Sequence, residues 1–540
     1  MSSLESIERA GRLMCRARRI LAYGNLDSIL QRPLYHGEGA VFPQFVERAR
    51  GCELVDTTGQ TFVDWVNGGG PVLLGYAHPA VEEAIRAQLA CGPTVSMMHP
   101  LEVELAEELI EMVPCAEMVA FGKNGSDSLT GAVRAARALT GREVILQYGM
   151  HGFHDWYVVG NPQVRGAPGS LAPLIQPFPY NDLDALRELL ERHAGRVAAV
   201  VMEPVREILP DPGYAQGVRE LTRRHGALLI FDEVVTAFRL GNGGGQAFLG
   251  VEPDLACLGK SMANGMPISA LVGRREFMEI VPAVAFGMTF RGETLTHAAA
   301  RAVLRVLREE PVAEHVARIG ERVRAATHRI CARLGLRCRL GGPPARMTFV
   351  FEDQGGRRWD QLQALFVQEC LKNGIFTNGN VLPSYAHDDL AVERTARGFE
   401  RALEVVAAAL EPDPSAPRAM IAIGFLEHVG EEARMLHLSG WMLLPDRAPD
   451  AVQVRLADGS LVPALTVERP DVAAAHPDVP GARQAGFALN VPLPALACDG
   501  RRELTLRALC GERVAFLCRV VLEGQAWTRP QWIGDGVIYA

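Results

Sequence analysis

Between residues 118 and 275, short apolar runs alternate with longer segments that have helical spacing. The run at 227–231 is continuous and follows a polar helical segment at 214–225, and similar runs occupy 118–121 and 198–202. Strands buried on both faces read as continuous apolar runs, and strands that alternate with helices form βαβ units. The pattern therefore predicts an α/β fold with a mostly parallel sheet.

Polar residues follow three of these runs. In a parallel sheet, ligands bind at the carboxyl ends of the strands. Glu203 and Asp232 each come directly after a predicted strand. The run at 118–121 leads into a turn that contains Asn124, Gly125 and Ser126 and opens an alanine-rich helix predicted at 127–140. Backbone N–H groups at such a helix start are a good phosphate site. We expect these groups to meet at one edge of the sheet.

Lys260 lies in a stretch with no acid nearer than Asp254. Poor solvation would lower the pKa of its amine, and a neutral amine can form an imine. A phosphate site, a buried acid and such a lysine together match pyridoxal 5'-phosphate (PLP), which needs all three.

Competing ligands have weaker support. An NAD site would need a G-x-G-x-x-G motif directly after a strand, and the glycine-rich segment 241–246 follows a polar loop instead. A P-loop is also excluded, because Asp254 stands at the position of its first glycine. His151 and His154 have no third ligand at a recognisable spacing, so no metal site is predicted. An aromatic or imidazole cover over a flat ligand is the preferred interpretation of this segment.

Composition narrows the partners and the compartment. The 540 residues carry a net charge of -8 without a basic stripe, so nucleic acid is not an expected partner. The charged N-terminus is unlike a signal peptide and no apolar run reaches the length of a membrane span, so a cytoplasmic protein without membrane attachment is expected. The 11 cysteines form no CxxC pair and are expected to be reduced.

Changes in pattern suggest the domains. We expect an N-terminal arm and part of a small domain at 1–60, a large cofactor-binding domain at 61–310, a small α+β domain at 311–411, a linker at 412–419 and an all-β, sandwich-like domain at 420–540. A β-hairpin is predicted at 52–66, and helices are predicted at 78–92, 99–113 and 388–410.

Several segments resemble the class III (fold type I) PLP-dependent aminotransferases, in particular the glutamate-1-semialdehyde 2,1-aminomutase-like branch. They lie at 45–66, 75–85, 99–109, 231–240 (FDEVVTAFRL), 253–273 (PDLACLGKSMANGMPISALVG) and 289–300 (TFRGETLTHAAA). The resemblance implies that Lys260 is the Schiff-base lysine and that Asp232 pairs with the pyridine nitrogen. It also implies phosphate contacts from Gly125, Ser126 and the neighbouring Asn124, and from Thr289 across the interface of a homodimer with a shared active site.

Two departures from the family pattern concern the cofactor face and the substrate. The aromatic residue expected before the HisGly of His151 is Met150, so a thioether, or Tyr148 or His154 after adjustment, would cover the ring. The aminomutase's serine-proline-x-arginine, which holds the substrate carboxylate, has no match; Tyr35 falls near the arginine's place, and Arg32 or Arg291 could replace it. Glu203, which follows a predicted strand, also belongs to the predicted site.

Three functions remain open on the sequence. The first is transamination between an amine and a carbonyl substrate, such as a sugar or a secondary-metabolite intermediate; the accessory β domain loosely resembles those of bacterial surface-sugar enzymes. The second is 2,1-aminomutation of glutamate semialdehyde, against which the missing arginine argues. The third is a non-catalytic PLP-fold scaffold whose β domain binds a partner, against which the intact Asp232 and Lys260 argue.

Overall fold

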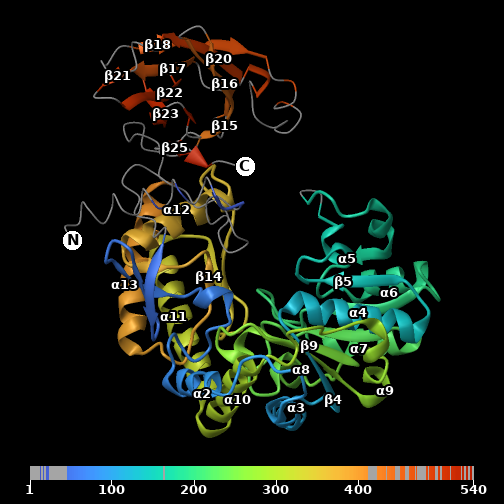
Figure 1. The fold of residues 1–540 in the computed structure, drawn as a ribbon. Helices are drawn as coiled ribbons and strands as arrows, with labels where there is room; N and C mark the ends of the chain where they lie inside the picture. The colour runs from blue at the N-terminus through green and yellow to red at the C-terminus, as the bar shows by residue number, and fades with distance from the viewer. Residues whose placement is uncertain are drawn as a thin grey trace.

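A computed structural model describes residues 45–161 and 164–410 continuously, a few positions before residue 23, and parts of 422–537, chiefly strands. A seven-stranded sheet of order β4-β10-β9-β8-β7-β5-β6 forms the centre of its first half (Figure 1). All its pairs are parallel except those of β10 with β4 and β9. The strands are β4 (Met118–Gly122), β5 (Val144–Tyr148), β6 (Ile175–Pro177), β7 (Val197–Met202), β8 (Leu228–Asp232), β9 (Leu255–Leu258) and β10 (Ser269–Gly273). The predicted mostly parallel α/β sheet is confirmed.

Helices cover both faces of this sheet, which explains why its strands are apolar throughout. Along β8, Leu229 and Phe231 point into one core, where α3, α6, α7 and α10 pack, whereas Ile230 faces a second core with α4. The helices of this region are α2 (Pro79–Leu89), α3 (Pro100–Met112), α4 (Gly125–Thr140), α5 (Asp155–Val158), α6 (Leu183–Arg192), α7 (Tyr214–His225), α8 (Gly244–Leu249), α9 (Arg275–Met278) and α10 (Thr294–Glu309), with 3-10 turns η1 (Asn67–Gly69), η2 (Gly169–Leu174), η3 (Lys260–Ala263) and η4 (Val281–Val284).

Most predicted elements differ from the observed ones by only a few residues at their ends. The helix predicted to start at residue 127 starts at Gly125, because Asn124 and Asp127 form a capping box that draws the turn into the first helical turn. The strand predicted at 227–231 occupies Leu228–Asp232, so Asp232 is its last residue. The hairpin predicted at 52–66 is confirmed as β2 (Glu53–Asp56) and β3 (Thr61–Asp64).

A separate core forms from the two ends of the continuously described chain. The hairpin lies in a sheet of order β1-β2-β3-β13, and a second sheet has the order β11-β12-β14. Val63 and Trp65 share a buried cluster with Phe349, Phe366 and Phe399. The remaining elements are β1 (Val46–Arg50), β11 (Cys338–Gly341), β12 (Met347–Phe351), β13 (Ile375–Phe376), β14 (Asn380–Val381), α11 (Val312–Leu334), α12 (Trp359–Lys372) and α13 (Asp389–Ala408).

The C-terminal segment contains strands, as the alternating sequence predicted. They form one five-stranded sheet and one seven-stranded sheet, in which every pair is antiparallel except β15 with β26. The strands are β15 (Ala422–Glu432), β16 (Met435–Leu443), β17 (Ala451–Leu456), β18 (Leu461–Pro463), β19 (Leu465–Val467), β20 (Gly486–Pro492), β21 (Ala497–Cys498), β22 (Arg501–Cys510), β23 (Arg513–Glu523), β24 (Ala526–Trp527), β25 (Gln531–Trp532) and β26 (Gly536–Val537), with a 3-10 turn, η5 (Ala482–Gln484). The sandwich arrangement and the domain boundaries stay predictions. None of the helices in the described residues combines the length and apolar composition needed to cross a bilayer.

Candidate active site

Asp232 is held in one orientation at the end of β8. Its side chain is buried, and Oδ2 lies 2.8 Å from Nδ1 of the buried His151. Oδ1 accepts a hydrogen bond from the Val234 backbone N–H at 3.1 Å. A carboxylate paired in this way requires Nδ1 of His151 to carry a proton. The arrangement therefore presents a fixed acceptor that suits a cationic N–H group.

Lys260 follows β9 and begins the 3-10 turn η3. Its φ of 42° lies in the left-handed region, which costs a non-glycine residue free energy. Burial lowers the pKa of its amine, and the charge of Arg346 lowers it further, whereas Asp232 and Glu203 act in the opposite direction. The structure thus contains a partly buried lysine whose lowered pKa favours the neutral amine, as nucleophilic chemistry at an amine requires.

The start of α4 forms a compact turn beside Asp232. Asn124 Oδ1 accepts from the Asp127 N–H, and Asp127 Oδ2 accepts from the Asn124 N–H at 3.0 Å. The following residues, Gly125 and Ser126, occupy the first helical turn, where backbone N–H groups have no carbonyl partner within the helix. A Cβ on Gly125 would lie 2.8 Å from Cγ2 of Val234, so the helix start can approach the Asp232 segment only with glycine there.

The loop after β5 closes against this turn. The Phe153 N–H donates to Ser126 Oγ at 3.2 Å, and a Cβ on Gly152 would overlap Ser126. Met150, which stands at the family's aromatic position, has a half-exposed side chain, and its N–H donates to Glu203 Oε1 at 2.9 Å. Among described contacts, Tyr148 stacks on Tyr180 and His154 contacts Thr130. Both alternative covers are therefore engaged elsewhere, and a Met150 cover stays a prediction.

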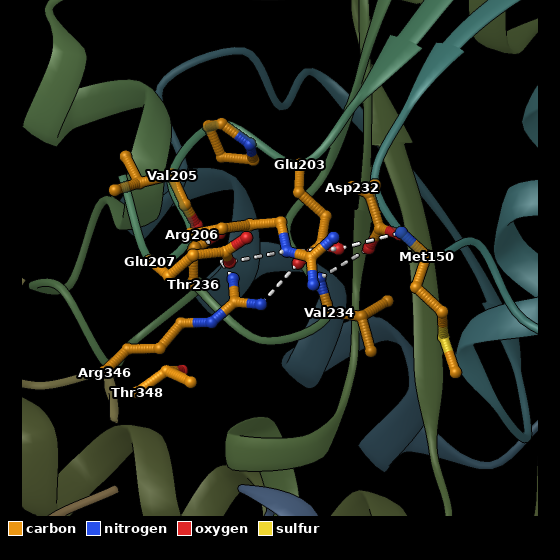
Figure 2. A network of polar contacts seen from close by, with 12 residues as sticks. Met150, Glu203, Val205, Arg206, Glu207, Asp232, Val234, Thr236, Arg346 and Thr348 are labelled. Carbon is orange, nitrogen blue, oxygen red and sulfur yellow. Dashed lines mark hydrogen bonds and ion pairs between the residues drawn. The ribbon is translucent and has the colours of Figure 1, made fainter. Parts of the chain in front are cut away.

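Glu203, which is buried, is the centre of an ionic network at the end of β7 whose other members are partly exposed (Figure 2). Its Oε2 accepts from Arg346 Nη2 at 2.6 Å, and Oε1 lies 3.5 Å from Nε of Arg206. Burial alone would raise the pKa of Glu203, but Arg346 and then Arg206 outweigh burial and bring the pKa to about 2. Figure 2 shows this network beside Met150, Asp232 and Val234. Asp232, His151, the Met150 backbone, Glu203 and Arg346 thus form one continuous chain of contacts.

The structure brings together only part of the predicted site. Asp232 and His151 pair directly, Glu203 contacts Met150, and Asn124, Gly125 and Ser126 form the α4 start, while Thr289 and Arg291 are exposed on the turn before α10. Tyr35 and Arg32 lie outside the described residues. Sequence reasoning did not indicate Arg206 or Arg346, because neither is the first residue after a predicted strand or belongs to a motif. The roles assigned to all these residues stay predictions.

These residues fit PLP on physical grounds. The α4 start offers backbone donors at the positive end of a helix, where a phosphate is stabilised. Asp232 supplies a fixed carboxylate and Lys260 a desolvated amine, and both elements reach the same sheet edge because β8 and β9 are parallel neighbours. The glycines at 125 and 152 leave no room for side chains where the turn and the loop meet.

Comparison with known proteins agrees with this geometry. The family profile described as Aminotransferase class-III matches residues 35–334. A glutamate-1-semialdehyde 2,1-aminomutase of Roseiflexus castenholzii is 35% identical over 67% of this chain and 91% of its own length. A 3-aminobutyryl-CoA aminotransferase of Cloacimonas acidaminovorans is 32% identical over 67% of this chain and 89% of its own.

Solved structures give the same result. The FumI protein of Sphingopyxis sp. MTA144, solved with PLP, has a TM-score of 0.69 and 32% identity, and the match covers 75% of this chain and 99% of FumI. The fold type I architecture, the PLP cofactor and the expected resemblance are thereby confirmed. This chain belongs to the class-III aminotransferase family of PLP-dependent enzymes.

Proposed function

We propose that this enzyme transfers an amino group between an amino donor and a carbonyl acceptor, with Lys260 and Asp232 as its catalytic residues. The observation that carries the proposal is the position of a desolvated lysine and a histidine-held carboxylate at the ends of neighbouring strands. Bound PLP supplies an electron sink for the negative charge that develops on the substrate Cα.

The side chains divide the work. Lys260 would hold the cofactor covalently, and its free Nζ would be the base that takes a proton from Cα of the donor and the acid that returns one to Cα of the product. Its lowered pKa keeps a fraction of the amine neutral for this step. Asp232 would keep the ring nitrogen of the cofactor protonated, and His151 holds this carboxylate in place. Gly125 and Ser126 would hold the phosphate from the α4 start, next to Asn124.

Lys260→Ala tests the catalytic assignment. We expect the protein purified with PLP to absorb in the visible range, to fix cofactor on the Lys260 peptide after borohydride reduction, and to lose visible absorbance when a donor amine is added. Lys260→Ala should abolish the covalent attachment and lower kcat by about 10²- to 10⁴-fold. Lys372→Ala, which removes an exposed lysine of α12, is the matched control. Unchanged spectrum and turnover in Lys260→Ala would refute the assignment.

Aminomutation is the second candidate, since relatives at 35% identity carry that name. It differs from transamination in needing no separate amino donor. Turnover of glutamate semialdehyde alone, with no added donor or acceptor, would favour the aminomutase. Turnover only when an amine and a different carbonyl compound are both present would favour transamination. If the bound cofactor reacts with no amine, the non-catalytic PLP-fold scaffold is the function that remains.

The proposal includes a homodimer whose subunits share the active site. Loop residues 92–98 are tied to α10 through Thr294, whose N–H and Oγ donate to the carbonyl oxygens of Pro93 and Gly92. Met97 is 84% exposed, and Met288 and Phe290, on the turn before α10, are 76% and 57% exposed. Apolar side chains gathered in this way mark an association surface. Thr289 lies within it, where a second copy would bring it near a phosphate.

A further inference from the structure

We propose that Arg239 is a positioning residue for Lys260, because its buried guanidinium ties together three chain segments that meet beside this lysine. The inference rests on the proposed function and adds to it a residue that acts through the backbone of the site. Arg239 lies in the turn that follows β8. Its Nη2 donates to the Gly70 carbonyl at 2.9 Å, and its Nη1 donates to the carbonyls of Pro383 at 2.8 Å and Ala345 at 3.2 Å.

The burial of Arg239 is costly for a residue with a stabilising role alone. Its side chain is completely buried. Within the described residues its acceptors are these three carbonyls, no carboxylate pairs with it, and its Nε has no partner. Burial lowers the pKa of Arg239 to about 9, with a further contribution from the charge of Arg346, so the group is still charged at pH 7. An ion buried without a counter-ion opposes folding, which indicates a role in the site.

The Gly70 carbonyl connects Arg239 with the turn that carries Lys260. This oxygen also accepts from Ser261 Oγ at 3.2 Å, so the buried cation and the residue after the lysine share one acceptor. A Cβ on Gly70 would lie 3.9 Å from Cδ of Lys260, so the Gly70 backbone lies beside the lysine side chain. Lys260 has a φ of 42°, and such a conformation persists only where surrounding contacts hold it. The anchored Gly70 carbonyl is one of these contacts.

The other two carbonyls bring the second core to the same place. Ala345 immediately precedes Arg346, and Pro383 follows Leu382, whose Cδ1 lies 3.6 Å from the position of a Cβ on Gly70. Burial lowers the pKa of the lysine amine most and Arg346 lowers it next, and the buried guanidinium acts in the same direction. One side chain thus sets the spacing of the segments around the lysine and adds to the charge that favours its neutral form.

Chemical labelling of the cofactor-free protein tests the effect of the charge. Only three of the 55 basic residues are lysines, so each can be followed by peptide mass spectrometry. We would measure acetylation by acetic anhydride over a range of pH, since only the neutral amine reacts, with Lys372 on α12 as the reference within the same molecule. The pH midpoint for Lys260 should lie below that for Lys372. It should move upward in Arg239→Met and stay lower in Arg239→Lys, which keeps the charge.

Covalent attachment of PLP, trapped with borohydride, tests the positioning. At pH 7 the attachment rate should fall about 10-fold or more in Arg239→Met, because small displacements from a reactive geometry reduce rates strongly. Arg239→Lys should recover only part of it, since an ammonium group lacks the fork that reaches three carbonyls. Ser261→Ala, which removes the other donor to the Gly70 carbonyl, should slow attachment by about 3-fold or more. Arg333→Met, which removes an exposed arginine of α11, should change neither measurement.

The outcomes separate this inference from the proposed function. If wild type attaches no PLP at Lys260, the proposed function fails, and the labelling midpoints still decide the role of Arg239. If wild type attaches PLP and both Arg239 variants match it in rate and midpoint, only the present inference fails. A lower melting temperature in both variants without a change in rate or midpoint would show that Arg239 only stabilises the fold. Should neither variant fold, Ser261→Ala decides, and a wild-type attachment rate in it would overturn the inference.

Discussion

Lys260 combines two unfavourable features that a residue selected only for stability would avoid. Its backbone is left-handed, and its partly buried amine is desolvated and affected by the charge of Arg346. Residues held in such conformations gather at functional sites, where the rest of the fold stabilises them. The free-energy cost is largest when the lysine is charged, because a buried ammonium group loses its hydration.

Removing this charge should stabilise the cofactor-free protein. Below the lowered pKa of Lys260 the folded chain carries the full cost of a buried ammonium. As the pH rises toward the ordinary lysine pKa of about 10.4, the folded chain has lost a proton that the unfolded chain retains, and the cost disappears. We therefore expect Lys260→Met to raise the melting temperature of the cofactor-free protein by roughly 2 °C or more at pH 7, and by less at pH 10.

Thermal unfolding at both pH values, followed by circular dichroism, measures this difference. Lys372→Met is the control, because the Lys372 amine lies on the surface of α12 beside Glu369. A melting temperature that falls at pH 7, or a gain that is the same at both pH values, would mean that the buried charge is not what makes Lys260 costly.

At the scale of residues, the sequence could identify site residues that follow a recognisable apolar run. Asp232 and Lys260 stood out because each follows an apolar run, and those runs became β8 and β9. Arg346 could not be found in this way. It precedes a short strand of another core, and only tertiary packing places it against Glu203.

At the scale of elements, the start of α4 and the segment after β8 depend on each other. The Val234 N–H fixes Asp232, and the Val234 side chain packs where a Cβ on Gly125 would be. The sequence predicted the strand, the turn and the helix, because capping residues and apolar periodicity are local features. It could not predict the contact between α4 and Val234, because no local pattern encodes a distance between segments so far apart in the chain.

Gly125→Ala should therefore weaken cofactor binding. The new Cβ would lie 2.8 Å from Cγ2 and 3.0 Å from Cγ1 of Val234, so the helix start and the Asp232 segment must separate. Overpacking of this kind costs about 1–3 kcal/mol, which we expect to raise the dissociation constant for PLP by about 10-fold. Titration of cofactor-free protein with PLP measures it. Gly169→Ala, where the Cβ meets nothing within 4 Å, is the control, and equal affinities in the two variants would contradict the prediction.

For the whole molecule, the candidate site joins two cores that the sequence presents as separate regions. Lys260 and Asp232 belong to the large sheet, whereas Arg346 comes from the region between α11 and α12. The order of α/β and α+β regions was predictable from periodicity. That the hairpin β2–β3 pairs with β13 from the other end of the described chain was not, because long-range strand pairing is determined by packing rather than local sequence.

The exposed apolar turn before α10 predicts that two copies of the chain associate. A charge placed in the centre of an apolar interface has to be desolvated, so we expect Phe290→Asp to weaken the homodimer by at least about 30-fold. Sedimentation velocity of the PLP-loaded protein should show a dimer for wild type and a shift toward monomer for Phe290→Asp. If Thr289 of one subunit contacts the phosphate bound by the other, as proposed, cofactor absorbance and turnover should fall with the dimer fraction. Leu390→Asp on α13, with an exposure of 59% against 57% for Phe290, is the matched control and should remain dimeric. A monomeric wild type with full activity would contradict both the interface and the shared site.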